Sequence, residues 1–307
     1  MPRKPTPGWL TYREQMDFFG CGHALWEPAP TFNCTRINIG DVGFIRRGQF
    51  HLLFSAGSPL GVRQLGVDVP ITFEQLNVGP LVSSQPRLPG CLRTPTVRPI
   101  GPDLVGAGSP YLSSERGMNF SFELTGDRGA ALVTRYPTYR QDSLLEAAFE
   151  AYTKRHYESW VAFARDSQYG NDIRPVLVSG LDMTRDFAMV AYSNEGTSSG
   201  CLPYTNYGPQ RCMVPSSEQD MYFLPSRLGD AGSITNEFNQ CVFIRYYTKH
   251  SRKPWAMFFR TELMRVGAGS HDLDSGDIRG RWSPFNDGAG SEPDAVARNT
   301  RIVEDGG

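Results

Sequence analysis

A serine in a glycine-rich turn is the feature of the sequence that most resembles catalytic machinery. Residues 196–200 read Gly-Thr-Ser-Ser-Gly, and this Gly-x-Ser-x-Gly spacing would make Ser198 the nucleophile of a hydrolase. A nucleophile elbow is a strand-to-helix turn, so a helix must follow the serine directly. Residues 201–206 instead contain a proline and turn-forming residues. The sequence therefore predicts a polar loop here.

Metal and nucleotide sites are not indicated by the sequence either. Cys21 and His23 form an isolated pair without a second pair at ligand spacing. His156 falls on the apolar face of an expected helix, which favours a core or boundary role. Residues 272–283 have some of the acidic spacing of a calcium loop, but Ser283 stands where the bidentate glutamate belongs. Since no phosphate-binding fingerprint appears, we expect no cofactor and no enzymatic activity.

One basic and aromatic stretch favours binding over catalysis. Between Arg245 and Arg260 the chain has no acidic residue, and tyrosine, tryptophan and phenylalanine alternate with the cations. This composition suits an anionic surface such as lipid headgroups, with single-stranded nucleic acid the less favoured ligand. The alternative is a half-buried strand with aromatic residues in the core and basic residues facing water. The candidate anionic-surface residues are Arg245, Lys249, Arg252, Lys253, Trp255 and Arg260.

A long helix is the clearest structural element that the sequence predicts. Asp142 or Ser143 can cap it, Ser143 and Glu146 have capping-box spacing, and apolar residues recur every three or four positions to about residue 168. Gly170 is a natural stop signal. We expect the apolar face of this helix to pack on a core and not to insert into a membrane.

Short apolar runs bounded by Gly and Pro predict strands on both sides of this helix. Arg47-Gly48 is expected to be the turn of a hairpin within residues 36–54. The strands at 175–179 and 187–192 are expected to form an antiparallel pair. The other predicted strands are 71–76, 120–124, 129–135 and 240–245.

These elements predict an α+β fold, mainly an antiparallel sheet with the helix of about 142–168 packed on it. One domain should extend over residues 36–265, with a loop-rich middle at 55–118. Before it we expect an irregular lead-in, residues 1–35, because Pro28 and Pro30 exclude a long helix.

A flexible, disordered C-terminal tail is expected over residues 266–307, where Gly, Ser and Asp dominate. Residues 267–307 carry a net charge of −4, which leaves +3 on the rest of this 307-residue chain of net charge −1. The acidic tail could fold back on the basic body, but the composition favours a solvated tail.

The compartment is expected to be cytoplasmic. The N-terminal residues lack the continuous apolar core of a signal peptide, and no apolar stretch is long enough to cross a bilayer. The six cysteines are too sparse for a disulfide framework in a chain of this size, which favours reduced thiols.

Several sequence blocks resemble a large uncharacterised family of basidiomycete fungal proteins. The most specific are I-G-D-V-G, within residues 37–43, and N-Q-C-V-F-I-R, at residues 239–245. Met183 stands where a lysine is common in that family, and Ser179 where a threonine is usual. The resemblance implies no activity, since none can be named for the family.

The order of the elements also resembles, more weakly, the pore-forming N-terminal domain of gasdermins. Paired strands, a Gly/Ser-rich middle, a long helix and a hairpin starting V-L-V-S-G follow one another in both. This resemblance implies a membrane-active, pore-forming effector, as in fungal cell death or defence. It would give the basic stretch the task of lipid capture and the acidic tail that of restraint.

Two functions therefore follow from the sequence. The first is a non-enzymatic, cytoplasmic interaction protein that binds a protein partner or another copy of itself. The alternative is a gasdermin-like protein that engages an anionic lipid membrane.

Overall fold

The computed structural model describes most of the first 193 residues and shorter stretches after them. The described ranges are 6–31, 35–58, 68–87, 90–100, 120–134, 138–167, 169–170, 173–185, 187–193, 201–205, 212–213, 221–224, 238–250, 262–266 and 282–283. Among these residues the structure is mainly antiparallel sheet with few helices, which confirms the predicted α+β class.

A twisted main sheet is built around two long strands, β10 and β15. Its order is β1-β15-β10-β2-β3, and β9 and β4 extend it from the second half of β10, while β16 extends it from β15. Strand β10 therefore pairs with β2 at Val176–Leu177 and with β9 at Gly180–Met183. The strands are β1 (His23–Ala24), β2 (Asp41–Arg46), β3 (Gln49–Ser55), β4 (Leu81–Arg87), β9 (Thr138–Ser143), β10 (Val176–Thr184), β15 (Gln240–His250) and β16 (Glu262–Val266).

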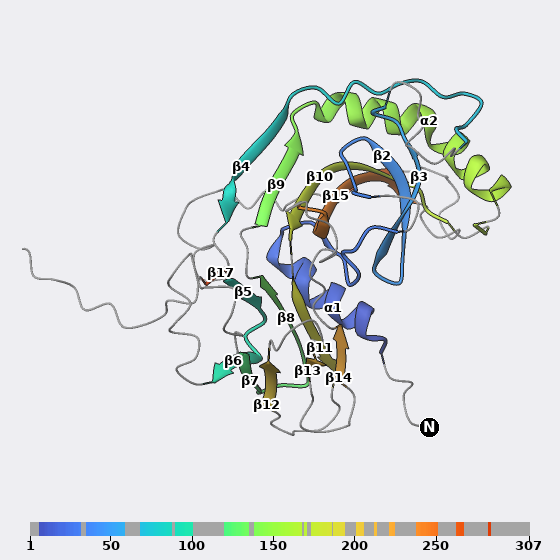
Figure 1. Ribbon diagram of the computed structural model, residues 1–307. Coiled ribbons are helices and arrows are strands. Elements are labelled where there is room, and N and C mark those ends of the chain that lie inside the picture. Colours follow the sequence, from blue (N-terminus) through green and yellow to red (C-terminus); the bar gives the residue numbers. More distant parts are fainter. Residues whose placement is uncertain are drawn as a thin grey trace, which may run out of the picture.

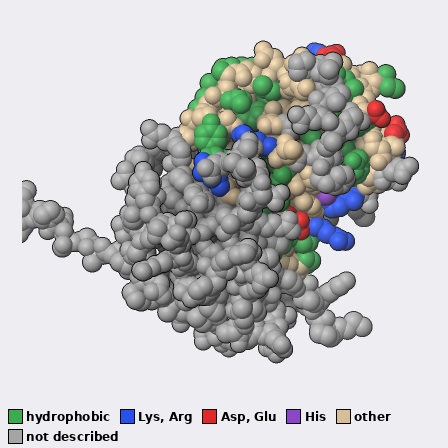
Figure 2. Space-filling view, in the orientation of Figure 1, with side chains coloured by type: hydrophobic (Ala, Val, Ile, Leu, Met, Phe, Trp, Pro, Cys, Tyr) green, Lys and Arg blue, Asp and Glu red, His purple; other side chains and the backbone are tan. Residues whose placement is uncertain are grey.

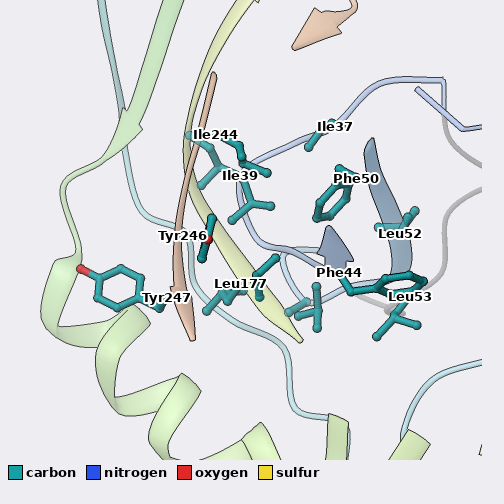
Figure 3. Packing of buried hydrophobic residues seen from close by; sticks show 14 of the residues in the cluster. Ile37, Ile39, Phe44, Phe50, Leu52, Leu53, Leu177, Ile244, Tyr246 and Tyr247 are labelled. Atoms are coloured by element: carbon teal, nitrogen blue, oxygen red, sulfur yellow. The ribbon is translucent and has the colours of Figure 1, made fainter. Parts of the chain in front are cut away.

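Helix α2 (Glu146–Asp166) covers one face of the main sheet and closes the first hydrophobic core. Phe149 and Trp160 of the helix are almost completely buried, and the ring of Phe149 lies 6.2 Å from that of Tyr247 on β15. Figure 3 shows side chains of the β2–β3 hairpin, Phe44, Phe50 and Leu52 among them, in the same core as Leu177 and Ile244. The predicted helix and its core-facing role are confirmed.

Two smaller sheets continue one another below the main sheet (Figure 1). Their orders are β14-β11-β8-β5-β17 and β13-β12-β7-β6, so the same four stretches of chain lie side by side in both. We call the two sheets together the ribbon. Its strands are β5 (Gly90–Arg93), β6 (Val97–Ile100), β7 (Phe120–Leu124), β8 (Arg128–Thr134), β11 (Ala188–Ser193), β12 (Cys201–Thr205), β13 (Cys212–Met213) and β14 (Met221–Leu224), and β17 (Trp282–Ser283) pairs with β5.

The prediction of an irregular lead-in is wrong for its central part. Helix α1 (Gly8–Met16) and the 3-10 turn η1 (Asp17–Phe19) precede β1, and α1 packs on β8 and β11. Pro28 and Pro30 exclude only a helix that would include them. Tyr12 and Met16 bury their side chains against the ribbon, so tertiary packing stabilises this short helix.

Two pairing predictions had different outcomes. The hairpin turn at Arg47-Gly48 is confirmed, since both residues have positive φ, 52° and 80°, as a two-residue hairpin turn requires. The predicted pairing of 175–179 with 187–192 is wrong, because β10 lies in the main sheet and β11 in the ribbon. Both strands are largely buried, and each lies inside its own sheet between other strands, β10 beside β15, β2 and β9 and β11 between β8 and β14.

Three further differences between the sequence predictions and the structure each concern a short segment. Residues 71–76 form a turn and an extended loop and no strand. The capping box is absent from α2: Ser143 ends β9, and its hydroxyl donates to the carbonyl of Val78 and accepts from the amide of Leu145. The predicted tail lies outside the described residues, apart from Val266 at the end of β16 and the two residues of β17.

Candidate functional site

Arg245, the first of the predicted surface cations, lies inside the protein. It is 3% exposed, and its guanidinium contacts three segments that are distant in sequence. Nε donates to Asp142 on β9, Nη1 donates to Asp182 on β10 at 2.8 Å, and Nη1 also donates to the carbonyl of Cys21 at 2.9 Å. Nη2 donates to the carbonyl of Gln141 at 3.0 Å. One side chain thus joins β9, β10, β15 and the N-terminal segment.

A second arginine completes a charged cluster of Arg140, Asp142, Asp182 and Arg245. Arg140 holds Asp182 in a bidentate pair, with Nε and Nη2 at 2.8 and 2.7 Å from the two carboxylate oxygens. Burial disfavours the ionised Asp182, but the two guanidinium groups outweigh it and lower the pKa of that carboxyl. Burial raises the pKa of Asp142 in spite of Arg245, although this side chain is 39% exposed.

Gly180 makes room for the charged cluster. A Cβ atom at this position would lie 2.0 Å from Oδ1 of Asp142 and 2.5 Å from Nε of Arg245. The pairing of β10 with β15 also shifts register between Val178 and Gly180. The irregular strand and the missing side chain together open a path for the guanidinium across β10.

This arrangement corrects the role predicted for Arg245. Its donors are already bound to two carboxylates and two carbonyls, so an anionic ligand would have to displace them. The cluster contains two arginines and two aspartates and is neutral overall. Its geometry is that of a structural tie between strands.

Of the other residues predicted to bind an anionic surface, the structure describes Lys249 alone, and this lysine pairs with an acidic residue. Lys249 Nζ lies 3.1 Å from Oε1 of Glu158 on α2 and 5.3 Å from the ring centre of Tyr157. Tyr246 and Tyr247 are buried, so the aromatic residues of this strand belong to the core. Arg252, Lys253, Trp255 and Arg260 lie outside the described residues.

The reactive motifs gain no support as a site from the described geometry. Ser198 is outside the described residues, but the segment after it is strand β12 and not the helix that a nucleophile elbow needs. No group of three metal-ligating side chains occurs in the described part of the chain. Cys21 is buried, and His23 Nδ1 lies 3.9 Å from Oδ2 of Asp17. His156 is 5% exposed on the inner face of α2, as predicted.

An exposed apolar edge on the main sheet is the feature that sequence reasoning missed. Residues 81–84 of β4 are all exposed, with Leu81 at 41% and Val82 at 44%, and nearby Leu144 is 61% exposed. Among the described strands β4 pairs with β9 alone, and no described strand lies along its other edge. Figure 2 shows hydrophobic side chains gathered over β4, β9 and the start of α2.

The sequence held one signal for this edge. No charged residue occurs from Gln75 to Pro86, and Leu81-Val82 lies between two prolines. Prolines at the ends of a strand are typical of a sheet edge, because they cannot donate a ladder hydrogen bond. The loop-rich composition around it concealed the strand.

A smaller basic surface lies at the turn of the β2–β3 hairpin. Arg46 and Arg47 are exposed there, and a Cβ atom on Gly48 would lie 3.3 Å from Cβ of Trp9. The guanidinium of Arg13 lies 5.9 Å from the centre of the Trp9 ring. Cations and a half-buried indole therefore share this end of the molecule.

Comparisons with protein-family models, with curated proteins and with solved structures found no match to this chain. Among the described helices, none is long and apolar enough to cross a membrane.

Proposed function

We propose that this chain is a non-enzymatic, cytoplasmic interaction protein that binds an extended apolar segment of a partner protein at the free edge of β4. The observation that carries this proposal is the run of four exposed residues on β4, which pairs with β9 alone among the described strands. An open edge offers unpaired backbone donors and acceptors, to which an incoming strand can bind.

The chemistry of the edge favours an uncharged apolar partner segment. Val82 and Leu81 project to opposite faces of β4, because successive side chains of a strand alternate. Each face of an added strand would therefore meet one exposed aliphatic side chain. The absence of charge from Gln75 to Pro86 means that no local repulsion or salt bridge selects a charged segment.

The test is selection of heptapeptides from a displayed random library, followed by fluorescence anisotropy with the purified full chain. We expect selected peptides to be rich in β-branched residues. Val82→Lys should weaken their binding by about tenfold or more, because a charge replaces the apolar contact. Ile71→Lys is the matched control, since Ile71 is also exposed but lies in a turn ten residues before β4 and not on the strand itself.

Peptides that bind Val82→Lys as tightly as the wild type would contradict the proposal. Sedimentation equilibrium of the protein alone separates self-association from partner binding. If the chain itself is the occupant, the wild type will form dimers that Val82→Lys abolishes and Ile71→Lys retains.

A membrane-active function of the gasdermin kind is the second candidate, and the ribbon favours it. The four chain stretches of the ribbon lie side by side and antiparallel, and β7 alternates Phe-Ser-Phe-Glu-Leu. Alternating strands can turn one apolar face to lipid. The exposed Arg46 and Arg47 beside Trp9 would suit an anionic headgroup layer.

Vesicles with and without phosphatidylserine, loaded with a dye, test this second function on the intact protein. It predicts flotation and leakage that need the anionic lipid and that decrease in Arg47→Glu. Neither flotation nor leakage with either vesicle would exclude it.

A further inference from the structure

The N-terminal segment, residues 8–28, lies between the main sheet and the ribbon. We call it the clamp. Helix α1 packs on β8 and β11 of the ribbon, whereas β1 pairs with β15 of the main sheet. The second hydrophobic core brings together Tyr12, Met16 and Trp26 of the clamp, Leu132 and Met189 of the ribbon, and Val242 and Phe243 of the main sheet. The clamp thus packs against both the main sheet and the ribbon, at the place where these two units meet (Figure 1).

The polar groups of the clamp are poorly satisfied. The hydroxyls of Thr11 and Tyr12 are buried and have no hydrogen-bond partner among the described residues. A buried polar group without a partner keeps the cost of its lost hydration, which opposes closure of the clamp. The closed clamp therefore combines apolar burial, which favours it, with polar burial, which does not.

The Asp17–His23 contact adds to this opposition. Asp17 accepts a hydrogen bond from the amide of Ala24 at 2.8 Å, but its other oxygen lies 3.9 Å from His23 Nδ1. Burial raises the pKa of Asp17 to about 6 and lowers that of His23 to about 4. Each group is therefore held in surroundings that disfavour its charged form.

The backbone bonds of the clamp to the main sheet lie mostly after Gly22. Strand β1 makes two residue pairs with β15, the amide of Leu25 donates to the carbonyl of Val242, and the carbonyl of Pro28 accepts from the amide of Cys241. The carbonyl of Cys21 accepts a hydrogen bond from Arg245. Gly20 and Gly22, with φ of 65° and 113°, flank that carbonyl. These two glycines, both with positive φ, lie between α1 and β1 and are well placed to act as a hinge.

We propose that α1 and η1 are a releasable part of the clamp, which opens at Gly20 and Gly22 while β1, the main sheet and the charged cluster remain folded. Opening breaks the Arg245 bond to the Cys21 carbonyl and leaves the bonds of Arg245 to Asp142 and Asp182 in place. It uncovers the face of β8 and β11 formed by Ala130, Leu132, Met189 and Ala191. The proposal does not depend on partner binding at β4.

Native-state amide hydrogen exchange on the full chain tests this proposal. Amides of α1 and the amide of Ala24, which donates to Oδ1 of Asp17 across the hinge, report opening of the clamp. Amides of β10 and β15 report unfolding of the main sheet. In the wild type we expect the clamp amides to exchange at least about tenfold faster than those of β10, since local opening costs less than global unfolding.

Two tyrosine variants make the test selective. Tyr12→Phe removes the unpartnered hydroxyl and should slow exchange of the clamp amides by about fivefold or more. Tyr152→Phe is the matched control on α2, where the hydroxyl donates to the carbonyl of Glu74. It should accelerate the β10 amides and leave the clamp amides unchanged, because α2 stays packed when the clamp opens.

A third variant acts in the opposite direction. A Cβ atom at Gly22 would lie 2.8 Å from the carbonyl oxygen of Ile244, so Gly22→Ala should accelerate clamp exchange and not exchange of β10. Equal acceleration of clamp and β10 amides in Tyr152→Phe would overturn the proposal, since it would mean that both open together in one global step.

Discussion

The charged cluster and the clamp treat buried polar groups in opposite ways. In the cluster, Arg140, Asp142, Asp182 and Arg245 all have partners, and the bidentate Arg140–Asp182 pair fixes geometry as well as charge. In the clamp, the Tyr12 hydroxyl has no partner among the described residues, and Asp17 and His23 are only loosely paired. Buried polar groups thus stabilise the charged cluster and destabilise the clamp, although the two regions meet at the hydrogen bond from Arg245 to the carbonyl of Cys21.

The largest effect is expected on removing the central guanidinium. Arg245→Met should lower the free energy of unfolding by about 3 kcal/mol or more, because Asp182 stays buried with one of its two cationic partners lost. Urea denaturation measures this loss. Lys249→Met on the same strand is the control, and its partner Glu158 is largely exposed, so it should cost less than about 1 kcal/mol. A loss in Arg245→Met as small as that in Lys249→Met would contradict the stabilising role of the charged cluster.

A smaller effect is expected when the space beside the cluster is filled. Gly180→Ala places a methyl group against Asp142 and Arg245 and should cost about 2 kcal/mol through overpacking. Its cost should shrink in the Arg245→Met background, because the guanidinium that the methyl group displaces is already gone. Strictly additive losses in this double-mutant cycle would show that Gly180 matters for another reason.

The smallest effects are pH dependences of the clamp. The pKa of Asp17, about 6 when folded against an ordinary 3.8, means that the folded state retains a proton that the unfolded state releases. Its contribution to stability therefore grows as the pH falls from 6 to 3.8. The pKa of His23, about 4 against an ordinary 6.5, acts the other way, and its contribution is lost as the pH falls from 6.5 to 4.

These opposed slopes can be separated by single substitutions. In Asp17→Asn the free energy of unfolding should fall more steeply on acidification than in the wild type, because the His23 contribution remains alone. In His23→Gln the free energy of unfolding should rise on acidification, because the Asp17 contribution remains alone. Asp17 is 38% exposed, so the rise should be the weaker of the two. Arg13 and the Tyr246 ring face the same pair and remain in both variants. Denaturation curves between pH 4 and 7 measure the slopes, and parallel slopes in the two variants would contradict this reading of the clamp.

The sequence predicted the elements that carry their own local signal. Helix α2 follows from its apolar periodicity and the β2–β3 hairpin from its turn, and both lie where residue types alone decide the structure. Strand β4 was missed, because its apolar pair lies in a Gly- and Pro-rich region and its pairing with β9 joins residues far apart in the chain.

The charged cluster could not be predicted for a related reason. Arg245 looked like a surface cation, since its partners Asp142 and Asp182 come from other strands and only the register of β9, β10 and β15 brings them together. The place of the missing Cβ at Gly180 is equally invisible in the sequence. Local sequence signals therefore predicted single elements such as α2 and the β2–β3 hairpin. The charged cluster depends on the pairing of strands that are far apart in the sequence.

The denaturant dependence of amide exchange tests the central contrast most directly. At increasing urea below the unfolding transition, we expect clamp amides to exchange with a low free energy of opening and little urea dependence, because opening exposes little surface. The β10 and β15 amides should show a higher free energy and the full urea dependence of global unfolding. If clamp and sheet amides instead share one free energy and one urea dependence, the clamp and the main sheet open together, which contradicts a clamp that opens separately.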